Sequence, residues 1–451
     1  MRVTTVLLLL CYVSPSQAID EVHKNDNTEK EKLVIVSSFP PDMTQLFESA
    51  YEALHPSVDV EVIKKKTTAG IAYVKNNPVD LFWVSAPDAF EVLKVKQMLQ
   101  SYHPIAKGIP RRIGGYPVND PDGFYVGFSA AGYGVMWNTE YLQSHHLSAP
   151  ERWQDLARPK YFGHISMSAP SRSGTTHLTL EAILQLNGWQ RGWSIIKSIA
   201  GNVQEITKKS SHVPKAVIKG EAGLGIVIDY YGLSALASGN PIDFVYPPTT
   251  VFVPANIGVL AQAKNVEHAK QFIEFLLTVP AQELLLDPKV GRLPILPTTY
   301  LSEKVPAGYP QPYRSKPLGS NKAYDVFTSQ VRYTLVNSLF DVMITYQLNA
   351  LQQVTHLMHQ AEQLLTENPD TAMPELTAAI IRARDLINYM PVDELSSHDP
   401  KFTVLFTKNR KKLEDVSEGK QADLEKNWSE SVAGNYRSAA DIMRNALNNI
   451  P

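Results

Sequence analysis

The sequence from residue 33 onward alternates short apolar runs with segments whose apolar residues follow helical spacing. Residues 33–36, 58–63 and 79–84 are rich in Val, Ile and Leu and end at loop-forming residues, which indicates buried strands. The segments after the first two runs have the spacing of helices with one apolar face. This strand–helix–strand alternation predicts an α/β fold with a doubly wound parallel sheet.

Small hydroxyl residues follow the first and third predicted strands. Ser37 and Ser38 come directly after residues 33–36, and Ser85 comes directly after residues 79–84. In open α/β sheets, ligands bind outside the carboxyl ends of the strands. Ser37, Ser38 and Ser85 are therefore candidate ligand-binding residues, although ordinary loop residues also occupy such positions.

Two long extended segments divide the chain further. We interpret residues 124–138 as a strand that crosses from one lobe to a second, and residues 251–260 as the return crossing. A chain of 451 residues is too long for one compact core and suits two or three domains. The predicted division is lobe 1 at residues 33–127 plus 257–320, lobe 2 at residues 128–256, and a C-terminal extension at residues 321–451.

The C-terminal extension has no strand pattern and is predicted to be all-helical. Apolar residues at helical spacing from Tyr324 to Leu357 predict one helix of about 40 residues, against a usual length of about 11–12. Further helices are expected near residues 374–390 and 424–447. We expect the long helix from Tyr324 and the helix at residues 424–447 to form an antiparallel bundle, closed by the helix at residues 374–390. We expect this bundle to dock on lobe 1 beside residues 260–277.

The N-terminus has the layout of a secretory signal peptide. A basic Arg2 precedes a short apolar run, and small residues at Ser16 and Ala18 predict cleavage after Ala18, which makes residues 1–18 the signal. The run is too short to span a membrane. Charged residues at 19–32 indicate a flexible leader. The single cysteine, Cys11, lies in the signal, so the exported protein is expected to lack thiols.

Several function classes receive no support. The formal net charge is −2, which gives a nucleic-acid partner no electrostatic basis. The sequence has no signature of a metalloprotease, a P-loop, a serine hydrolase or a Cys-based metal site. We therefore expect no catalytic residues, no bound metal, no cofactor and no membrane-spanning segment. His356 and His359 could bind metal by their spacing, but we expect both to face solvent.

A loop rich in hydroxyl groups precedes the predicted helix at residues 177–185. Its residues are Arg172, Ser173, Gly174, Thr175 and Thr176. Hydroxyl groups at a helix start can simply cap unpaired backbone N–H groups. The same N–H groups and the helix dipole also suit an anion, and an arginine could add a charged contact. The loop is either an anion site or a cap, and its place in a two-lobed exported protein favours the site.

Tyr230 and Tyr231 follow a predicted strand at residues 224–228. Aromatic packing in the core is the common fate of such a pair. Alternatively, one tyrosine reaches a cleft between the lobes as a hydrogen-bond donor or a metal ligand. We favour Tyr231 for that role, because side chains of an extended segment alternate between two faces.

These segments together resemble the ABC-transporter solute-binding proteins of the ferric-ion-binding type, and within them the phosphoglycerate transport regulatory protein family. The resemblance rests on the segments LVIVSSFPPDMT, VDLFWVSAPDAFEVL, FYVGFSAAGYGVMWN, SAPSRSGTTHLTLEAILQ and GLGIVIDYYGLSA, and on the long C-terminal extension. It implies the two-lobed periplasmic-binding-protein type 2 fold, a periplasmic location, and phosphate binding by Ser173, Gly174, Thr175 and Thr176. It also implies a partner in the membrane, either a sensor kinase or an ABC permease.

The leading hypothesis is a binding protein that senses or delivers a small phosphorylated anion, similar to phosphoglycerate or phosphoenolpyruvate. One alternative is a ferric-ion-binding protein, since the resemblance places two iron ligands at Tyr230 and Tyr231. Iron binders also supply lobe 1 ligands, where this chain has Phe39-Pro40 and Ser85. The second alternative is an exported enzyme that acts on phosphate esters.

Overall fold

The computed structural model describes residues 30–313, 318–320, 322, 324–369, 373–407 and 418–450. The predicted signal peptide, its cleavage site after Ala18 and most of the leader lie outside these residues. The first strand, β1, begins at Glu31, so the last two residues of the predicted leader are part of a strand.

Lobe 1 contains the predicted α/β alternation. Its strands lie in the order β2-β1-β3-β11, in which the first three are parallel and β11 is antiparallel to β3. The strands are β1 (Glu31–Ser37), β2 (Val58–Lys64), β3 (Leu81–Val84) and β11 (Phe252–Val259). The helices are α1 (Pro41–Leu54), α2 (Thr67–Val74), α3 (Pro87–Val95), α9 (Val266–Leu276) and α10 (Val279–Glu283). Trp83 lies in the core, as expected, with Phe39, Phe47 and Phe272 around it.

The long strand β6 (Val126–Asn138) belongs to both lobes, as its length predicted. Its first half pairs with β11, and its second half pairs with β9 (Leu224–Ile228) and β10 (Ile242–Val245). Glycine is required in the second half, because a Cβ at Gly134 would collide with the carbonyl oxygen of Val245. The residue limits of the two lobes remain predictions.

Lobe 2 continues the sheet through parallel strands. β7 (Ile165–Ser168) lies between β9 and β8 (Val203–Thr207) and is parallel to both. The helices of this lobe are α4 (Thr139–Ser144), α5 (Gly174–Asn187), α6 (Trp189–Gly201), α7 (His212–Ile218) and α8 (Asp229–Ala237). Short elements complete the two lobes: β4 (Arg112–Ile113), β5 (Tyr116–Pro117), β12 (Leu293–Pro294) and the 3-10 turns η1 (Trp153–Ala157), η2 (Pro159–Tyr161), η3 (Pro170–Arg172), η4 (Leu284–Leu286) and η5 (Pro297–Leu301).

The described part of the C-terminal region is all-helical, and we call residues 324–369, 373–407 and 418–450 the helical module. It contains α11 (Val326–Val331), α12 (Tyr333–Met343), η6 (Thr345–Gln347), α13 (Leu348–Glu367), α14 (Pro374–Ile387), α15 (Glu394–His398), α16 (Pro400–Thr403) and α17 (Lys420–Asn448). The prediction of one long helix from Tyr324 was wrong. The chain leaves helical geometry at Arg332 and Ile344, and the separate helices pack on different parts of lobe 2: α12 contacts η3 and α5, whereas α13 contacts α6.

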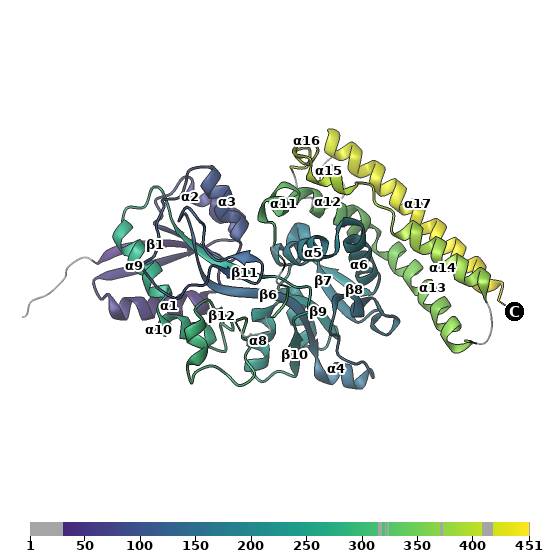
Figure 1. Ribbon diagram of the computed structural model, residues 1–451, viewed down its shortest axis with the longest axis horizontal. Helices are drawn as coiled ribbons and strands as arrows, with labels where there is room; N and C mark the ends of the chain where they lie inside the picture. Colours follow the sequence, from purple (N-terminus) through teal and green to yellow (C-terminus); the bar gives the residue numbers. More distant parts are fainter. Residues whose placement is uncertain are drawn as a thin grey trace, which may run out of the picture.

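The helical module docks on lobe 2, so the prediction of docking on lobe 1 was also wrong (Figure 1). Trp193 and Ile196 of α6 share one core with Leu351 and Val354 of α13. The apolar face of α9, which we expected to receive the module, is already covered by the core of lobe 1. The bundle itself is confirmed: α13, α14 and α17 pack together, and Trp428, Val432, Tyr436, Ala440 and Met443 are buried.

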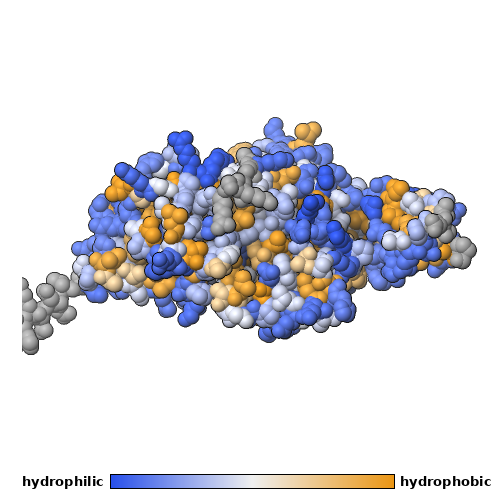
Figure 2. All heavy atoms as spheres, turned by 60° about the horizontal axis from the view of Figure 1, so that its bottom comes forward, coloured by the Kyte–Doolittle hydropathy of each residue, from blue (hydrophilic) through white to orange (hydrophobic). Residues whose placement is uncertain are grey.

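Among the described residues, no helix combines the length and the apolar character that crossing a bilayer requires. On the face seen in Figure 2, hydrophobic residues occur in small groups between hydrophilic ones.

Candidate functional site

The carboxyl ends of β1 and β3 lie next to each other at one edge of lobe 1. Ser37 is in register with Trp83, so Ser38 and Ser85 leave the sheet at the same edge. Ser37 is fully buried, and its Oγ accepts a hydrogen bond from the N–H of Phe39 at 3.1 Å. The structure therefore gives Ser37 a role within the turn. Ser85 is half-buried beside it.

Ser38 is the next residue of this loop. Its Oγ is buried and has no hydrogen-bond partner among the described residues. Lys64, at the end of β2, donates to the carbonyl oxygens of Ser38 and Phe39, the first at 2.5 Å. The ammonium group of Lys64 thus holds the loop after β1 in place.

Arg292 lies where the two lobes meet, just before β12. Its side chain is only 2% exposed. The guanidinium carbon is 4.7 Å from the ring centroid of Phe39 in lobe 1 and 4.4 Å from that of Tyr230 in lobe 2. Its Nη1 has no hydrogen-bond partner, and Arg292 forms no ion pair within the part of the chain that the structure describes. Burial lowers the pKa of the guanidinium.

Three tyrosine hydroxyl groups fix the backbone that carries Arg292. Tyr309 donates to the carbonyl oxygen of Arg292 itself at 2.9 Å. Tyr300 and Tyr313 donate to the carbonyl oxygens of Pro294 and Ile295, at 3.1 and 2.8 Å. In addition, β12 pairs with β6 at the junction of the lobes. Arg292 is therefore presented from a rigid backbone.

One carboxyl group, that of Asp229, is electrostatically coupled to Arg292, although the two form no ion pair among the described residues. Burial, and then the charge of Arg292, lower the pKa of Lys64. The nearby Asp229 is completely buried, and its Oδ2 accepts from the N–H of Gly132 at 2.6 Å and from the hydroxyl of Tyr246 at 3.0 Å. Burial raises the pKa of Asp229 to about 7, so at neutral pH its carboxyl group is only partly ionised. An anion could supply the missing negative charge.

Tyr230 and Tyr231 lie in the first turn of α8, and both are half-buried. Their ring centroids are 4.2 Å apart. The argument that favoured Tyr231 was wrong, because it assumed an extended chain, and the two residues are helical. Tyr230 makes the contact with Arg292, and burial raises the pKa of its phenol.

The loop before α5 is a well-formed cap. The Oγ of Ser173 accepts from both the N–H and the hydroxyl group of Thr176, each at 3.0 Å. Gly174 is exposed, whereas Arg172 and Thr175 are half-buried. The Oγ of Ser171, just before them, is buried without a hydrogen-bond partner among the described residues. The capping interpretation thus accounts for Ser173 and Thr176.

The start of α5 nevertheless lies at the same edge as the start of α8. These helices follow β7 and β9, which are parallel neighbours, so both helix N-termini end up outside the carboxyl ends of the sheet. Both lobes contribute to the contacts of Arg292, through Phe39 after β1 and Tyr230 in α8. The structure therefore brings Phe39 and Tyr230 to Arg292, and Ser38 is the residue before Phe39.

Sequence reasoning missed Arg292, Lys64 and Asp229. One signal for Arg292 was available: it is a cation within the otherwise apolar run at residues 290–297. The role of Lys64 had no local signal, because a lysine at a strand end is ordinary. It depends on where the loop after β1 folds back.

The charge of Arg292 disfavours a ferric ion at Tyr230. Among the residues that the structure describes, no group of three or more His, Cys, Asp or Glu side chains could hold one. The guanidinium of Arg292 over the ring of Tyr230 would repel a ferric ion bound to that phenolate. His359, which we expected in solvent, is instead half-buried and bonds Asn202 of lobe 2 at 2.8 Å, whereas His356 is exposed as expected.

Comparison with known proteins shows the family of the chain. The family model described as bacterial extracellular solute-binding protein matches residues 76–324. The chain belongs to that family. Within it, this solute-binding protein is 28% identical over 383 residues to the phosphoglycerate transport regulatory protein PgtC of Salmonella typhimurium, covering 83% of this chain and 89% of the relative. The resemblance inferred from its motifs is thereby confirmed.

Solved structures confirm the two-lobed periplasmic-binding-protein type 2 fold. The periplasmic binding protein AfuA from Actinobacillus pleuropneumoniae, solved with fructose-6-phosphate, aligns with a TM-score of 0.61 at 19% identity, over 70% of this chain and 99% of AfuA. The ferric binding protein from Campylobacter jejuni aligns with a TM-score of 0.51 at 20% identity, over 60% of this chain and 89% of that protein.

Proposed function

We propose that this protein is exported to the periplasm, binds a small phosphorylated anion between its lobes, and senses or delivers that anion without chemical conversion. The observation that carries the proposal is Arg292, a buried cation with no ion-pair partner among the described residues, placed between one ring from each lobe. Burying an unpaired charge is costly. A fold retains such a group when a ligand pairs with it.

The polar groups near Arg292 suit a phosphate or carboxylate. Arg292 Nη1 and the ammonium of Lys64 are cationic donors, and the Oγ of Ser38 is a free hydroxyl among the described residues. The N-termini of α5 and α8 add N–H groups and a favourable dipole. Each hydrogen bond to a charged oxygen contributes about 1.5–3 kcal/mol, so a few of them suffice for micromolar binding.

The relatives support the ligand class. PgtC is named for phosphoglycerate transport regulation, and AfuA was solved with fructose-6-phosphate, so both names refer to phosphorylated metabolites. We infer a ligand similar to phosphoglycerate or phosphoenolpyruvate, and a link to the regulation of its uptake. The partner would be a membrane sensor kinase or an ABC permease, and the helical module is the part of the chain that such a partner could contact without covering the ligand site.

A ligand screen tests the proposal. The mature protein is titrated by calorimetry with 2- and 3-phosphoglycerate, phosphoenolpyruvate, fructose 6-phosphate and inorganic phosphate, at two salt concentrations. We expect a phosphorylated carboxylate to bind best, and more weakly at high salt. A parallel addition of ferric citrate should give no visible band. A coloured ferric complex together with no anion binding would refute the proposal in favour of iron binding.

A further inference from the structure

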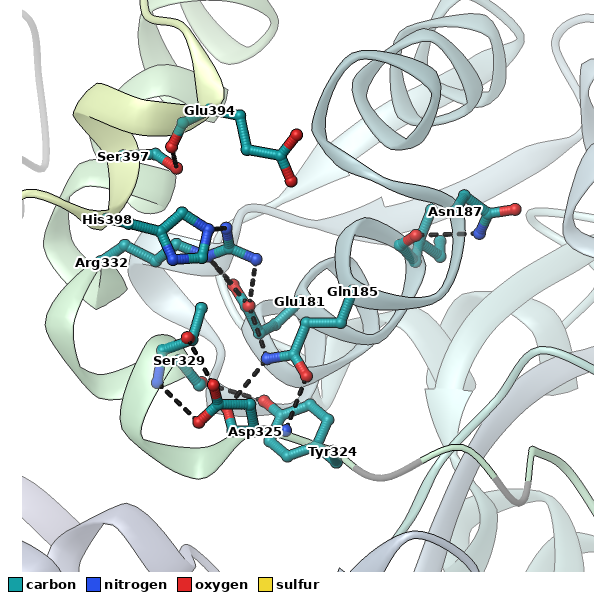
Figure 3. A network of polar contacts seen from close by, with 12 residues as sticks. Glu181, Gln185, Asn187, Tyr324, Asp325, Ser329, Arg332, Glu394, Ser397 and His398 are labelled. Carbon is teal, nitrogen blue, oxygen red and sulfur yellow. Dashed lines mark hydrogen bonds and ion pairs between the residues drawn. The ribbon is translucent and has the colours of Figure 1, made fainter.

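One face of α5 is bonded to the helical module along its whole length. His177, Glu181 and Gln185 are four residues apart and therefore lie on the same face of the helix. His177 Nδ1 is 2.9 Å from Asn337 Oδ1 in α12. Gln185 exchanges two hydrogen bonds with the backbone of Asp325, at 2.9 and 2.8 Å. Figure 3 shows Gln185 beside Asp325. It also shows a second contact, which lies on α5 between those of His177 and Gln185 and joins Glu181 to Arg332.

That central contact is a buried ion pair. Arg332 Nη2 and Glu181 Oε1 are 2.6 Å apart, and the side chains are 3% and 0% exposed. Arg332 Nε donates to both carboxylate oxygens, and the guanidinium lies 5.0 Å from the ring centroid of Trp189. His398 of α15 completes the group, 3.2 Å from Arg332 Nη1. A pair so well satisfied and so deeply buried resists separation.

The neighbouring helix α6 binds a second part of the module. Lys197 Nζ donates to the carbonyl oxygens of Ile387 and Tyr389 at the end of α14, at 3.0 and 2.6 Å. Trp189 Nε1 donates to the carbonyl of Val392 at 2.8 Å. Two elements of lobe 2 thus hold two separate parts of the module. We expect this arrangement to prevent rotation of the module on lobe 2.

Among the described residues, the ring contact and the hydrogen bond between the module and lobe 1 both come from its first residue, Tyr324. Nearby, Val326 packs against the apolar core that includes lobe 1, and Asp88 of α3 is close enough to help raise the pKa of Tyr333. The ring of Tyr324 stacks on Tyr116 of β5, with centroids 5.5 Å apart, and its N–H donates to the carbonyl of Gly115 at 3.4 Å. The next residue, Asp325, already bonds Gln185 of lobe 2 and caps α11. The chain therefore passes from lobe 1 to lobe 2 between Tyr324 and Asp325, as a third connection beside β6 and β11.

We propose that the helical module is a rigid extension of lobe 2 that pivots against lobe 1 at Tyr324 and Asp325. Closure of the lobes on the anion then swings the module relative to lobe 1, and the ligand-bound protein acquires a different outer shape far from the site. The ligand-dependent step rests on the proposed function; the rigid attachment does not. A membrane partner that touches both the module and lobe 1 could read this change.

Distance measurements between spin labels test the proposal. Because Cys11 is the only cysteine and lies in the signal peptide, the mature chain can be labelled at chosen sites without background. Exposed positions are available in lobe 1 (Asp59), in lobe 2 (Glu140) and on α17 (Arg437). Each is changed to cysteine, in pairs. With 3-phosphoglycerate we expect the 59–140 and 59–437 distances to shift and the 140–437 distance to stay constant.

The outcomes separate the two proposals. A shift of the 140–437 distance on ligand binding, or a 59–437 distance that stays fixed while 59–140 shifts, would overturn the pivot. Absence of any ligand effect would count against the proposed function instead. In that case, the distances in the ligand-free protein still test the rigid attachment. The pivot requires a narrow distribution of 140–437 distances, and a distribution as broad as that of the 59–437 distances would refute it.

Matched variants test whether the polar face of α5 carries the attachment. Arg332→Gln should broaden the 140–437 distribution. Arg384→Gln, which removes an exposed ion pair with Glu362 inside the module, should leave it unchanged. If Arg332→Gln does not fold, the double variant Glu181→Leu with Arg332→Met removes the pair without leaving a buried charge. An unchanged distribution in a folded variant would show that the ion pair does not hold the module.

Discussion

The carboxylate of Glu181 in lobe 2 is completely buried against the guanidinium of Arg332 in the helical module, with a shortest separation of 2.6 Å. Glu181 lies on α5, the helix whose first turn carries the candidate anion loop. The same helix therefore connects the ligand edge of lobe 2 to the C-terminal module. Neither residue would attract attention as a site in the sequence.

Removal of one partner of this pair should be costly. Glu181→Ala leaves the guanidinium of Arg332 buried without its counter-charge, and we expect a loss of about 3–5 kcal/mol in the free energy of unfolding. Glu181→Leu combined with Arg332→Met should recover most of that loss. Urea unfolding followed by tryptophan fluorescence measures both variants. A loss for Glu181→Ala no larger than for the exposed Arg384→Ala would contradict the structure.

Two variants of the loop before α5 distinguish its capping role from a role in ligand binding. Ser173→Ala removes the acceptor for the Thr176 N–H, so it should lower stability by about 0.5–2 kcal/mol. Thr175 takes no part in this cap, so Thr175→Val should leave the melting temperature almost unchanged while it weakens binding of 3-phosphoglycerate. Calorimetry and thermal melting of both variants give the answer. Unaltered affinity in Thr175→Val would mean that the loop is a cap only.

The two tyrosines should contribute unequally. Tyr230 stacks on Arg292, so Tyr230→Leu removes a cation–π contact of about 0.5–2 kcal/mol and should lower anion affinity. Tyr231→Leu should have a smaller effect. Titration of each variant with 3-phosphoglycerate compares them. A larger loss in Tyr231→Leu would restore the assignment that the sequence favoured.

The buried His177 predicts a specific pH dependence. Burial lowers its pKa from 6.5 to about 4, so the folded protein keeps this ring neutral while the unfolded chain takes up a proton below 6.5. Its contribution to stability is therefore complete above pH 6.5 and decreases as the pH falls toward 4. Between pH 7.5 and 4.5 the decrease should reach about 2–3 kcal/mol.

The pH dependence of stability must be compared between the wild type and a variant of His177, because other groups change the stability in the opposite direction. Burial raises the pKa of Asp88 and of Asp229 to about 7, so both carboxyl groups favour the folded state more strongly as the pH falls below 7. The difference in unfolding free energy between the wild type and His177→Gln isolates the histidine. That difference should move in favour of the variant on acidification, and a difference independent of pH would contradict the buried neutral ring.

Local patterns in the sequence predicted the parts of the fold that local patterns determine. The strands around Trp83, the crossing strand β6 and the bundle stripe through Trp428 and Tyr436 follow from periodicity alone. Docking of the module does not, because α6 and α9 each have an apolar face, and the sequence of neither helix shows which face the lobes leave free to bind the module. The break at Arg332 has the same cause, since its partner Glu181 is distant in the chain.

The candidate site could be predicted only in part. Ser38 and Tyr230 were found because they follow strands, and the edge of a parallel sheet gathers such residues. Arg292 was missed because its importance arises from burial between Phe39 and Tyr230, which come from opposite lobes. A pattern within one segment cannot reveal such a contact.

The most direct test of the account is a calorimetric titration of Arg292→Met with 3-phosphoglycerate, beside the wild type and the exposed control Arg437→Met. We predict that Arg292→Met binds about 10–100-fold more weakly, which corresponds to the loss of one or more hydrogen bonds to a charged group. Because a buried cation is removed, the ligand-free variant should also melt at a higher temperature than the wild type. The control should match the wild type in both respects. Wild-type affinity in Arg292→Met would contradict the central claim that this arginine binds the anion.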